Sequence, residues 1–146
     1  MVIGHLGIAL LQHSVLNAGL VPVIAGGLFP DMLDKTLCQV LRVTPSGRMW
    51  GHTALGVAVS TTLVTSFAGR RAGRSWLLGY LGHLLADSDG SIPWWYPFRT
   101  YTFEPSPGFV EILQNFTENR DEMALEFGLL TVSLLAWAIT SSRSAR

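Results

Sequence analysis

Apolar residues gather in four long segments of the chain, at 2–30, 53–69, 75–86 and 123–140. None of them alternates apolar and polar residues as a half-buried strand does, and three are of helical length. Charged residues lie mainly in the connections between these segments. The pattern therefore predicts an all-α fold, a compact bundle of membrane helices.

The first apolar segment is interrupted near its middle, from Asn17 to Pro22. Proline inside a helix removes a hydrogen bond and clashes with the preceding turn. We therefore expect two shorter helices, at about 3–16 and 20–29, joined by a bend. A bend would bring the ends of the segment together, whereas one straight helix would hold them roughly 40 Å apart at 1.5 Å per residue.

The composition favours contact with lipid. The chain of 146 residues is 49% hydrophobic and 14% charged, whereas about a quarter of the residues in soluble domains are charged. Segments 53–69 and 123–140 are about long enough to cross a bilayer, which takes roughly 20 residues. The length is that of a single domain covering residues 1–146, so we expect one membrane-embedded domain.

The placement of charge predicts an orientation. Acid-free arginine stretches separate the second and third segments and end the chain: Arg70, Arg71 and Arg74, then Arg143 and Arg146. All ten carboxylates lie in the other connections or at helix ends. By the positive-inside tendency, the arginine stretches and the C-terminus face the cytoplasm of a multi-pass inner-membrane protein. The carboxylate-rich side faces the other way.

Charge balance and cysteine content narrow the function classes. Acidic and basic residues number ten each, so no electrostatic attraction to nucleic acid is indicated. Cys38 is the only cysteine, which excludes an intrachain disulfide and a cysteine-based zinc site. The sequence has no P-loop and no GxGxxG, HExxH or GxSxG motif. Any metal must therefore be bound by histidine and carboxylate ligands.

The third segment carries two side chains that can bind metal. His83 and Asp87 in GYLGHLLAD are four residues apart, so a helix places them on one face. An imidazole nitrogen with a carboxylate oxygen suits Zn²⁺, Mn²⁺ or Fe²⁺. Ionisable groups inside apolar segments are costly and usually functional. The alternative is a buried histidine hydrogen-bonded to a neighbouring carboxylate.

Further candidate ligands lie on the same side of the inferred topology. Asp31 and Asp34 in FPDMLDK come directly after the first predicted helices, with the proline at the turn, and His52 in GRMWGHT precedes the next helix. Each of them alone could be a helix cap or a polar boundary residue. Their convergence with the HxxxD pair near helix ends favours a metal site.

Other polar residues in the apolar segments have different expected roles. His5 becomes a further ligand if the first segment folds back, whereas His13, about two turns later, is expected to be structural. Glu122 and Glu126 are expected to cap the last helix, in which Glu126 is the only charge of the apolar stretch.

The long connection at 88–120 holds eight of the fifteen aromatic residues, including WWYPF at 94–98. Tryptophan and tyrosine favour the membrane interface. The connection could therefore be an interfacial loop over a site, and the alternative is a lid packed over the hydrophobic helices.

The order of the motifs GHLGIAL, GGLFPDMLDKTL, SGRMWGHTALG and GYLGHLLADSDGSIPWWYPF resembles the YdjM-like family of membrane-bound, predicted metal-dependent hydrolases. That family is also described as LexA-binding and associated with the inner membrane. The resemblance covers residues 1–103. The chain is also distantly similar to zinc-dependent phospholipase C and the P1-type nucleases, whose helical sites use an early His, an Asp, a His and an HxxxD pair.

The resemblance implies a metal-ligand set. It consists of His5, Asp31, His52, His83 and Asp87, with Asp34 as a further candidate. No histidine follows position 83, so the later histidine ligands of the zinc phospholipases have no counterpart here. This departure favours one or two metal ions over three.

The leading hypothesis is a membrane-bound hydrolase that uses a divalent ion, with zinc ahead of manganese or iron, to cleave a phosphoester or a lipid-like ester. The ion would lower the pKa of a water molecule and polarise the scissile group. Asp34 would accept the proton of the water, and Arg48 would steady an anionic oxygen. The first rival is a non-catalytic membrane protein with a structural metal site or a polar network between helices. The second is a partner-binding protein, as the LexA-binding label implies, although the chain has no basic or amphipathic partner motif.

Overall fold

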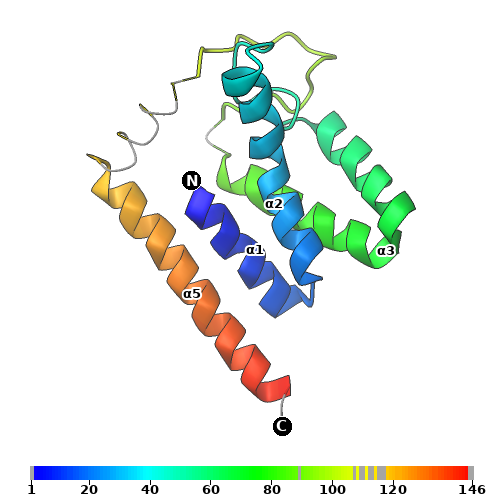
Figure 1. The fold of residues 1–146 in the computed structure, drawn as a ribbon, viewed down its shortest axis with the longest axis vertical. Helices are drawn as coiled ribbons and strands as arrows, with labels where there is room; N and C mark the ends of the chain where they lie inside the picture. Colours follow the sequence, from blue (N-terminus) through cyan, green and yellow to red (C-terminus); the bar gives the residue numbers. More distant parts are fainter. Residues whose placement is uncertain are drawn as a thin grey trace.

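The computed structural model describes residues 2–88, 90–106, 108, 111, 114 and 118–144, and only the backbone of Val2, Glu122, Arg143 and Ser144. Every regular element in this part of the chain is helical, which confirms the predicted all-α fold. The elements are α1 (Val2–Leu16), α2 (Leu20–Lys35), the π-helical turn η1 (Thr36–Val40), α3 (Ala54–Ala86) and α5 (Arg120–Ser144). Figure 1 shows α1, α2 and α3 gathered together, with α5 lying along α1. Arg146, expected on the cytoplasmic side, lies outside the described residues.

The first apolar segment is broken where the sequence predicted. α1 ends at Leu16 and α2 begins at Leu20. Asn17 between them has a φ of 52°, a left-handed conformation that asparagine tolerates better than most residues. His13 donates a hydrogen bond from Nδ1 to the carbonyl of Ala18 at 2.6 Å, which ties the end of α1 to the bend. The start of α1 is thereby returned to the end of α2.

α2 is longer than predicted. The expectation that the helix stops at a proline turn was wrong, because α2 continues through Pro30 to Lys35. Asp31 and Asp34 are consequently helical residues and not residues after the helix. Pro30 is fully buried, and a Cβ on Gly51 would lie 2.6 Å from its carbonyl oxygen. Pro30 removes one hydrogen bond from the helix, and close packing against Gly51 is found at the same position.

The second and third apolar segments form one helical hairpin, α3. Gly69, with φ 84° and ψ 167°, separates its two arms. Thr53 caps the first arm by accepting a hydrogen bond from the amide of Gly56 at 2.8 Å. Between the arms, the Trp76 indole donates to the hydroxyl of Ser60 at 3.1 Å. The hairpin brings the end of the second arm back beside the start of the first (Figure 1).

α2 packs against the second arm of α3 with the two backbones in close contact. A Cβ on Gly79 would lie 2.0 Å from the carbonyl oxygen of Val23, and one on Gly26 would lie 2.3 Å from that of Trp76. Small residues allow this approach, as they do at helix contacts in membrane proteins. The contact fixes the position of α3 relative to α2.

α5 has a different surface from the other helices. Among the described residues, it contains the one helical stretch long and apolar enough to cross a membrane, Met123–Ser142, of which only 11% is buried. Val132 and Leu135 are 58% and 59% exposed. The first arm of α3, expected to be about long enough to span, is not among such stretches.

The aromatic connection after α3 is partly packed and partly exposed. The carbonyl of Trp94 accepts a hydrogen bond from the amide of Ala54 at 2.9 Å, and its ring packs on the cluster that contains Tyr80. Trp95 and Phe98 point outward, with exposed fractions of 57% and 78%. Figure 1 shows this yellow-green connection at the same end of the molecule as the end of α2. The packing of Trp94 agrees with the lid, and the interfacial loop stays a prediction for the exposed part.

Candidate metal centre

Four side chains from separate parts of the chain meet at one end of the bundle. Asp31 comes from α2, His52 from the residue before the cap of α3, and His83 and Asp87 from the end of α3. One ligand atom from each lies within 4.8 Å of the others. The two histidines and Asp87 are buried, and Asp31 is half-buried. This group could hold a metal ion.

The two imidazoles of the cluster face each other through the same nitrogen. Nε2 of His52 lies 3.2 Å from Nε2 of His83. Nδ1 of His52 lies 2.8 Å from Oδ2 of Asp34, and Nδ1 of His83 lies 2.7 Å from the carbonyl oxygen of Gly27. A carboxylate and a carbonyl can only accept, so both Nδ1 atoms are assigned the proton and both Nε2 atoms carry lone pairs. Two facing lone pairs require a cation between them, either a proton or a metal ion.

The distances between the imidazoles and the carboxylates are compatible with a shared ion, although the four ligand atoms together are spread over as much as 4.8 Å. Oδ2 of Asp87 lies 3.7 Å from Nε2 of each histidine, and Oδ1 of Asp31 lies 3.9 and 4.0 Å from them. Nitrogen and oxygen ligands bind zinc at about 2.0–2.2 Å, so two ligands of one ion are at most about 4.2 Å apart. Two nitrogens at a tetrahedral angle are about 3.3 Å apart. The four imidazole–carboxylate distances lie below the first limit, and the nitrogen–nitrogen distance of 3.2 Å is close to the tetrahedral value.

Asp34 lies behind His52. Its Oδ2 accepts hydrogen bonds from His52 and from the amide of Met49 at 2.7 Å, and its Oδ1 accepts one from the amide of Gly51 at 2.8 Å. The hydroxyl of Tyr80 donates to the carbonyl of Gly51 at 2.5 Å. Asp34 is fully buried. These bonds hold the loop before α3 and fix the ring of His52, as carboxylates behind ligand histidines commonly do.

His5 reaches the cluster from α1, because the bend folds the first segment back. Its ring stacks on that of His83, with centroids 3.9 Å apart and planes 17° from parallel. Its Nε2 lies 3.1 Å from Oδ1 of Asp87, whose Oδ2 faces the other two histidines. His5 is buried, and its Nδ1 has no hydrogen-bond partner within the described structure. His5 therefore supports Asp87 from outside the four-residue group.

Two basic side chains border the cluster on its more exposed side. Nη2 of Arg48 lies 3.1 Å from Oδ2 of Asp87, and its Nη1 donates to the hydroxyl of Ser91 at 2.9 Å. Lys35 pairs with Oδ2 of Asp31 in the same helix. The Arg48 side chain is 38% exposed, so it connects the buried carboxylate with the surface.

Burial and neighbouring groups set the protonation of the cluster. Burial alone would raise the pKa of Asp87, but the imidazoles of His5 and His52 hold it well below its usual range. Burial, and next the charge of His5, lower the pKa of His83 to about 4. Burial opposes protonation of His52 as well, but the hydrogen bonds and charges of the surrounding carboxylates, Asp34 first, together outweigh it and raise the pKa. His83 is thus a neutral donor at pH 7, whereas a proton competes with a metal ion at His52.

The family model of the YdjM inner membrane protein matches residues 1–145. The chain belongs to this family. The match extends the resemblance, which rested on residues 1–103, over the C-terminal helix as well. No curated protein and no solved structure matches the chain. Membership of the YdjM family agrees with the exposed apolar surface of α5.

One polar contact of this YdjM family protein was not predicted. Glu126 was expected to cap its own helix, but its Oε2 accepts hydrogen bonds from the amides of Ile3 and Gly4, at 3.1 and 3.4 Å. These amides begin α1 and directly precede His5. Glu126 is fully buried, and as the only charge in an apolar segment it already carried the signal of a functional polar group.

Proposed function

We propose that the chain is a metal-dependent hydrolase of the inner membrane, and that residues 1–146 act as one domain. Asp31, His52, His83 and Asp87 would hold a divalent ion. The observation that carries the proposal is the pair of Nε2 atoms 3.2 Å apart, each left with a lone pair because the Nδ1 of its ring is engaged. Two imidazoles and two carboxylates favour zinc, and they also suit manganese or iron.

The surrounding residues have positioning roles in this proposal. Both oxygens of Asp34 are engaged, so we assign it to orienting His52 instead of accepting a proton from water. The carbonyl of Gly27 orients His83 in the same way, and His5 supports Asp87. A divalent ion bound there lowers the pKa of water toward neutrality and polarises the bond to be cleaved.

We propose a phosphoester with an apolar group as the substrate class. A guanidinium binds phosphate oxygens through paired hydrogen bonds, and Arg48 offers one that is partly exposed beside Asp87. The connection that is hydrogen-bonded to the start of α3 exposes Trp95 and Phe98 near this end of the molecule. These rings would contact the apolar part of a lipid-like substrate.

We also propose that the cluster faces away from the cytoplasm in a multi-pass arrangement. Support comes from the arginines of the α3 corner, which have no carboxylate partner among the described residues and lie at the opposite end of the α3 arms from His52 and Asp87. A reporter fused to the C-terminus should be active in the cytoplasm. An extracytoplasmic reporter would reverse the orientation.

The metal site can be tested on detergent-purified protein by elemental analysis. We expect bound zinc in the wild type and little metal in His52→Ala and Asp87→Ala. Ser133→Ala is the control, because this buried serine of α5 bonds to its own helix and should leave the metal content unchanged. Negligible metal in the wild type and in all variants would contradict the metal site.

Hydrolysis is tested next, on a panel of phosphodiesters and phospholipids. Arg48→Gln should lower turnover while the protein keeps its metal, because the guanidinium contacts the substrate anion in this proposal. If the metal-loaded wild type hydrolyses none of these esters, a structural metal site is favoured over an enzyme.

A further inference from the structure

The corner of α3 concentrates positive charge without a counter-charge. Arg70, Arg71 and Arg74 are exposed, and none of them has a carboxylate partner among the residues that the structure describes. The sequence from 35 to 86 contains no acid at all. Three guanidiniums therefore remain available to an external anion.

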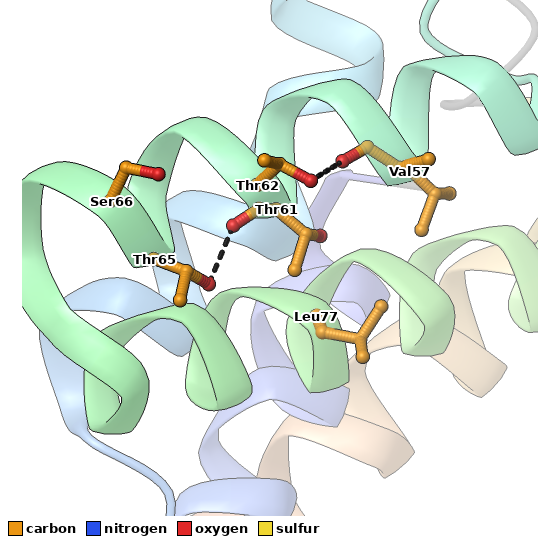
Figure 2. A pocket seen from close by; sticks show the side chains of 7 residues that line it. Val57, Thr61, Thr62, Thr65, Ser66 and Leu77 are labelled. Carbon is orange, nitrogen blue, oxygen red and sulfur yellow. Dashed lines mark hydrogen bonds between the residues drawn. The ribbon is translucent and has the colours of Figure 1, made fainter.

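A groove of about 360 Å³ lies between the two arms of α3 (Figure 2). Its lining includes Val57, Thr61, Thr62, Thr65 and Leu77. The groove is larger than twice the ~150 Å³ cavity that accommodates a benzene molecule. It therefore has room for part of an acyl chain.

Two of the threonines that line this groove have hydroxyl groups bonded to their own helix. The hydroxyl of Thr62 donates to the carbonyl of Ala58, and that of Thr65 donates to the carbonyl of Thr61, both at 2.7 Å (Figure 2). A hydroxyl bonded to its own helix has its donor satisfied, and the methyl group remains for packing. Thr61 differs, because its hydroxyl is buried without a partner in the described structure. The methyl groups of the other two threonines, with Val57 and Leu77, leave most of the lining suited to a hydrocarbon.

The arginines and the groove share one face of the second arm. Arg70, Arg74 and Leu77 are spaced by four and three residues, which places them on the same side of a helix. Arg71 neighbours Arg74 but is about 100° round the helix from Arg70 and about 120° from Leu77, so it lies further from the groove. The groove ends at Thr65 and Ser66, about one helical turn before the corner at Gly69. By this spacing Arg70 and Arg74 are on the side of the arm that Leu77 presents to the groove, one to two turns from Leu77.

We propose that the α3 hairpin binds an anionic phospholipid of the surrounding bilayer. The headgroup phosphate would lie between Arg70 and Arg74, and an acyl chain would lie in the groove. Phe67, at the corner and 88% exposed, adds an apolar contact beside the headgroup. The site is separate from the His/Asp cluster, because the 16 residues of the first arm from Ala54 to Gly69 extend roughly 24 Å at 1.5 Å per residue.

The test is native mass spectrometry of the full-length protein from detergent micelles, titrated with phosphatidylglycerol or with phosphatidylcholine of the same acyl chains. We expect phosphatidylglycerol to bind at least tenfold more tightly to the wild type. Arg74→Gln should weaken that binding about fivefold, and the Arg70→Gln/Arg74→Gln variant about 25-fold, from the ~1 kcal/mol that each arginine gains at an anionic surface. Arg71→Gln removes the same charge further from the groove and should change the affinity less than twofold.

The groove is tested with Ala58→Phe, a change at an exposed position that fills it. This variant should weaken both lipids to a similar degree. Unchanged metal content and circular dichroism would show that each variant is folded. Equal affinity for the two lipids, an Arg71→Gln loss as large as that of Arg74→Gln, or unchanged binding in Ala58→Phe would overturn the proposal. Displacement of the lipid by millimolar inorganic phosphate alone would also overturn it, because a plain anion site would explain the result.

Discussion

The interior of the helical bundle buries polar and ionisable side chains, whereas the surface of α5 exposes apolar ones. The largest fully buried side chains include His52, His83 and Asp34. On α5, by contrast, Val132 and Leu135 are more than half exposed. Charged groups are almost never fully buried in soluble domains unless they are paired, and large exposed apolar surfaces mark contact with another apolar phase.

The contrast separates two tasks. The buried polar groups are held by specific hydrogen bonds, such as those from Gly51 and Met49 to Asp34, so the cost of their burial is offset by fixed geometry. The exposed Val132 and Leu135 of α5 have no polar group to satisfy, and their surface suits the acyl chains of a bilayer. The two regions meet at Glu126, a carboxylate of α5 that is bonded to the start of α1.

The largest expected effect follows from removing the acceptor at the centre of the buried network. Asp34→Ala leaves the amides of Met49 and Gly51 and the ring of His52 without their acceptor, so we expect roughly 3–5 kcal/mol of lost stability. Metal affinity should fall about 10–100-fold, because the ring is no longer oriented. Thermal unfolding in detergent and metal titration measure the two effects. Asp34→Asn, which keeps one acceptor oxygen, should lose less; equal unfolding temperatures for Asp34→Ala and wild type would show that the network does not stabilise the fold.

The next effect in size tests the surface of α5. Val132→Lys places a charge on an exposed position near the middle of Met123–Ser142. It should cost about 2.5–3.5 kcal/mol of membrane insertion. Val43→Lys is the matched control, because Val43 is 67% exposed in the connection before α3, and a surface change there should stay within about 0.5 kcal/mol. Membrane fractionation of the expressed chains measures the difference, and similar insertion of both variants would place α5 outside the bilayer.

The sequence predicted those parts of the fold that depend on neighbouring residues. The bend was predicted from Asn17, Gly19 and Pro22; Asn17 adopts the left-handed conformation, and Pro22 lies in the first turn of α2, where its missing amide is tolerated. The continuation of α2 beyond Pro30 could not be predicted in this way, because Pro30 packs against Gly51, which belongs to a loop distant in the sequence. Local propensity is overridden wherever two remote segments lie in close contact.

The candidate site shows the same limit. Charge placement and helix ends were enough to put His52, His83 and Asp87 on one side of the molecule. The different positions of Asp31 and Asp34 were not predictable, because both lie on α2 and its rotation decides which one faces the cluster. The partners of Asp34 are 15 to 18 residues away in the sequence, so no local pattern indicates them.

A smaller effect is expected where the two regions meet. Glu126→Ala removes the acceptor for two amides at the start of α1, which should cost about 1–2 kcal/mol, as the loss of a helix cap does. Metal affinity should decrease as well, because His5 follows these amides and contacts Asp87. Ser133→Ala is the control, since Ser133 is equally buried on α5 but bonds to its own helix. Identical unfolding temperatures and metal affinities in the two variants would separate α5 from the site.

The smallest effect is expected at the partly exposed edge of the cluster. Lys35 pairs with Asp31 one helical turn away, and 35% of the lysine side chain is exposed. Such pairs contribute only about 0.3–0.5 kcal/mol, so Lys35→Gln should barely change the unfolding temperature. Burial alone would raise the pKa of Asp31, whereas Lys35 lowers it, so the variant shifts that pKa upward and the metal should bind more weakly only as the pH falls. A loss of stability as large as that of Asp34→Ala would mean that the number of charges, and not the buried hydrogen-bond network, stabilises this end of the bundle.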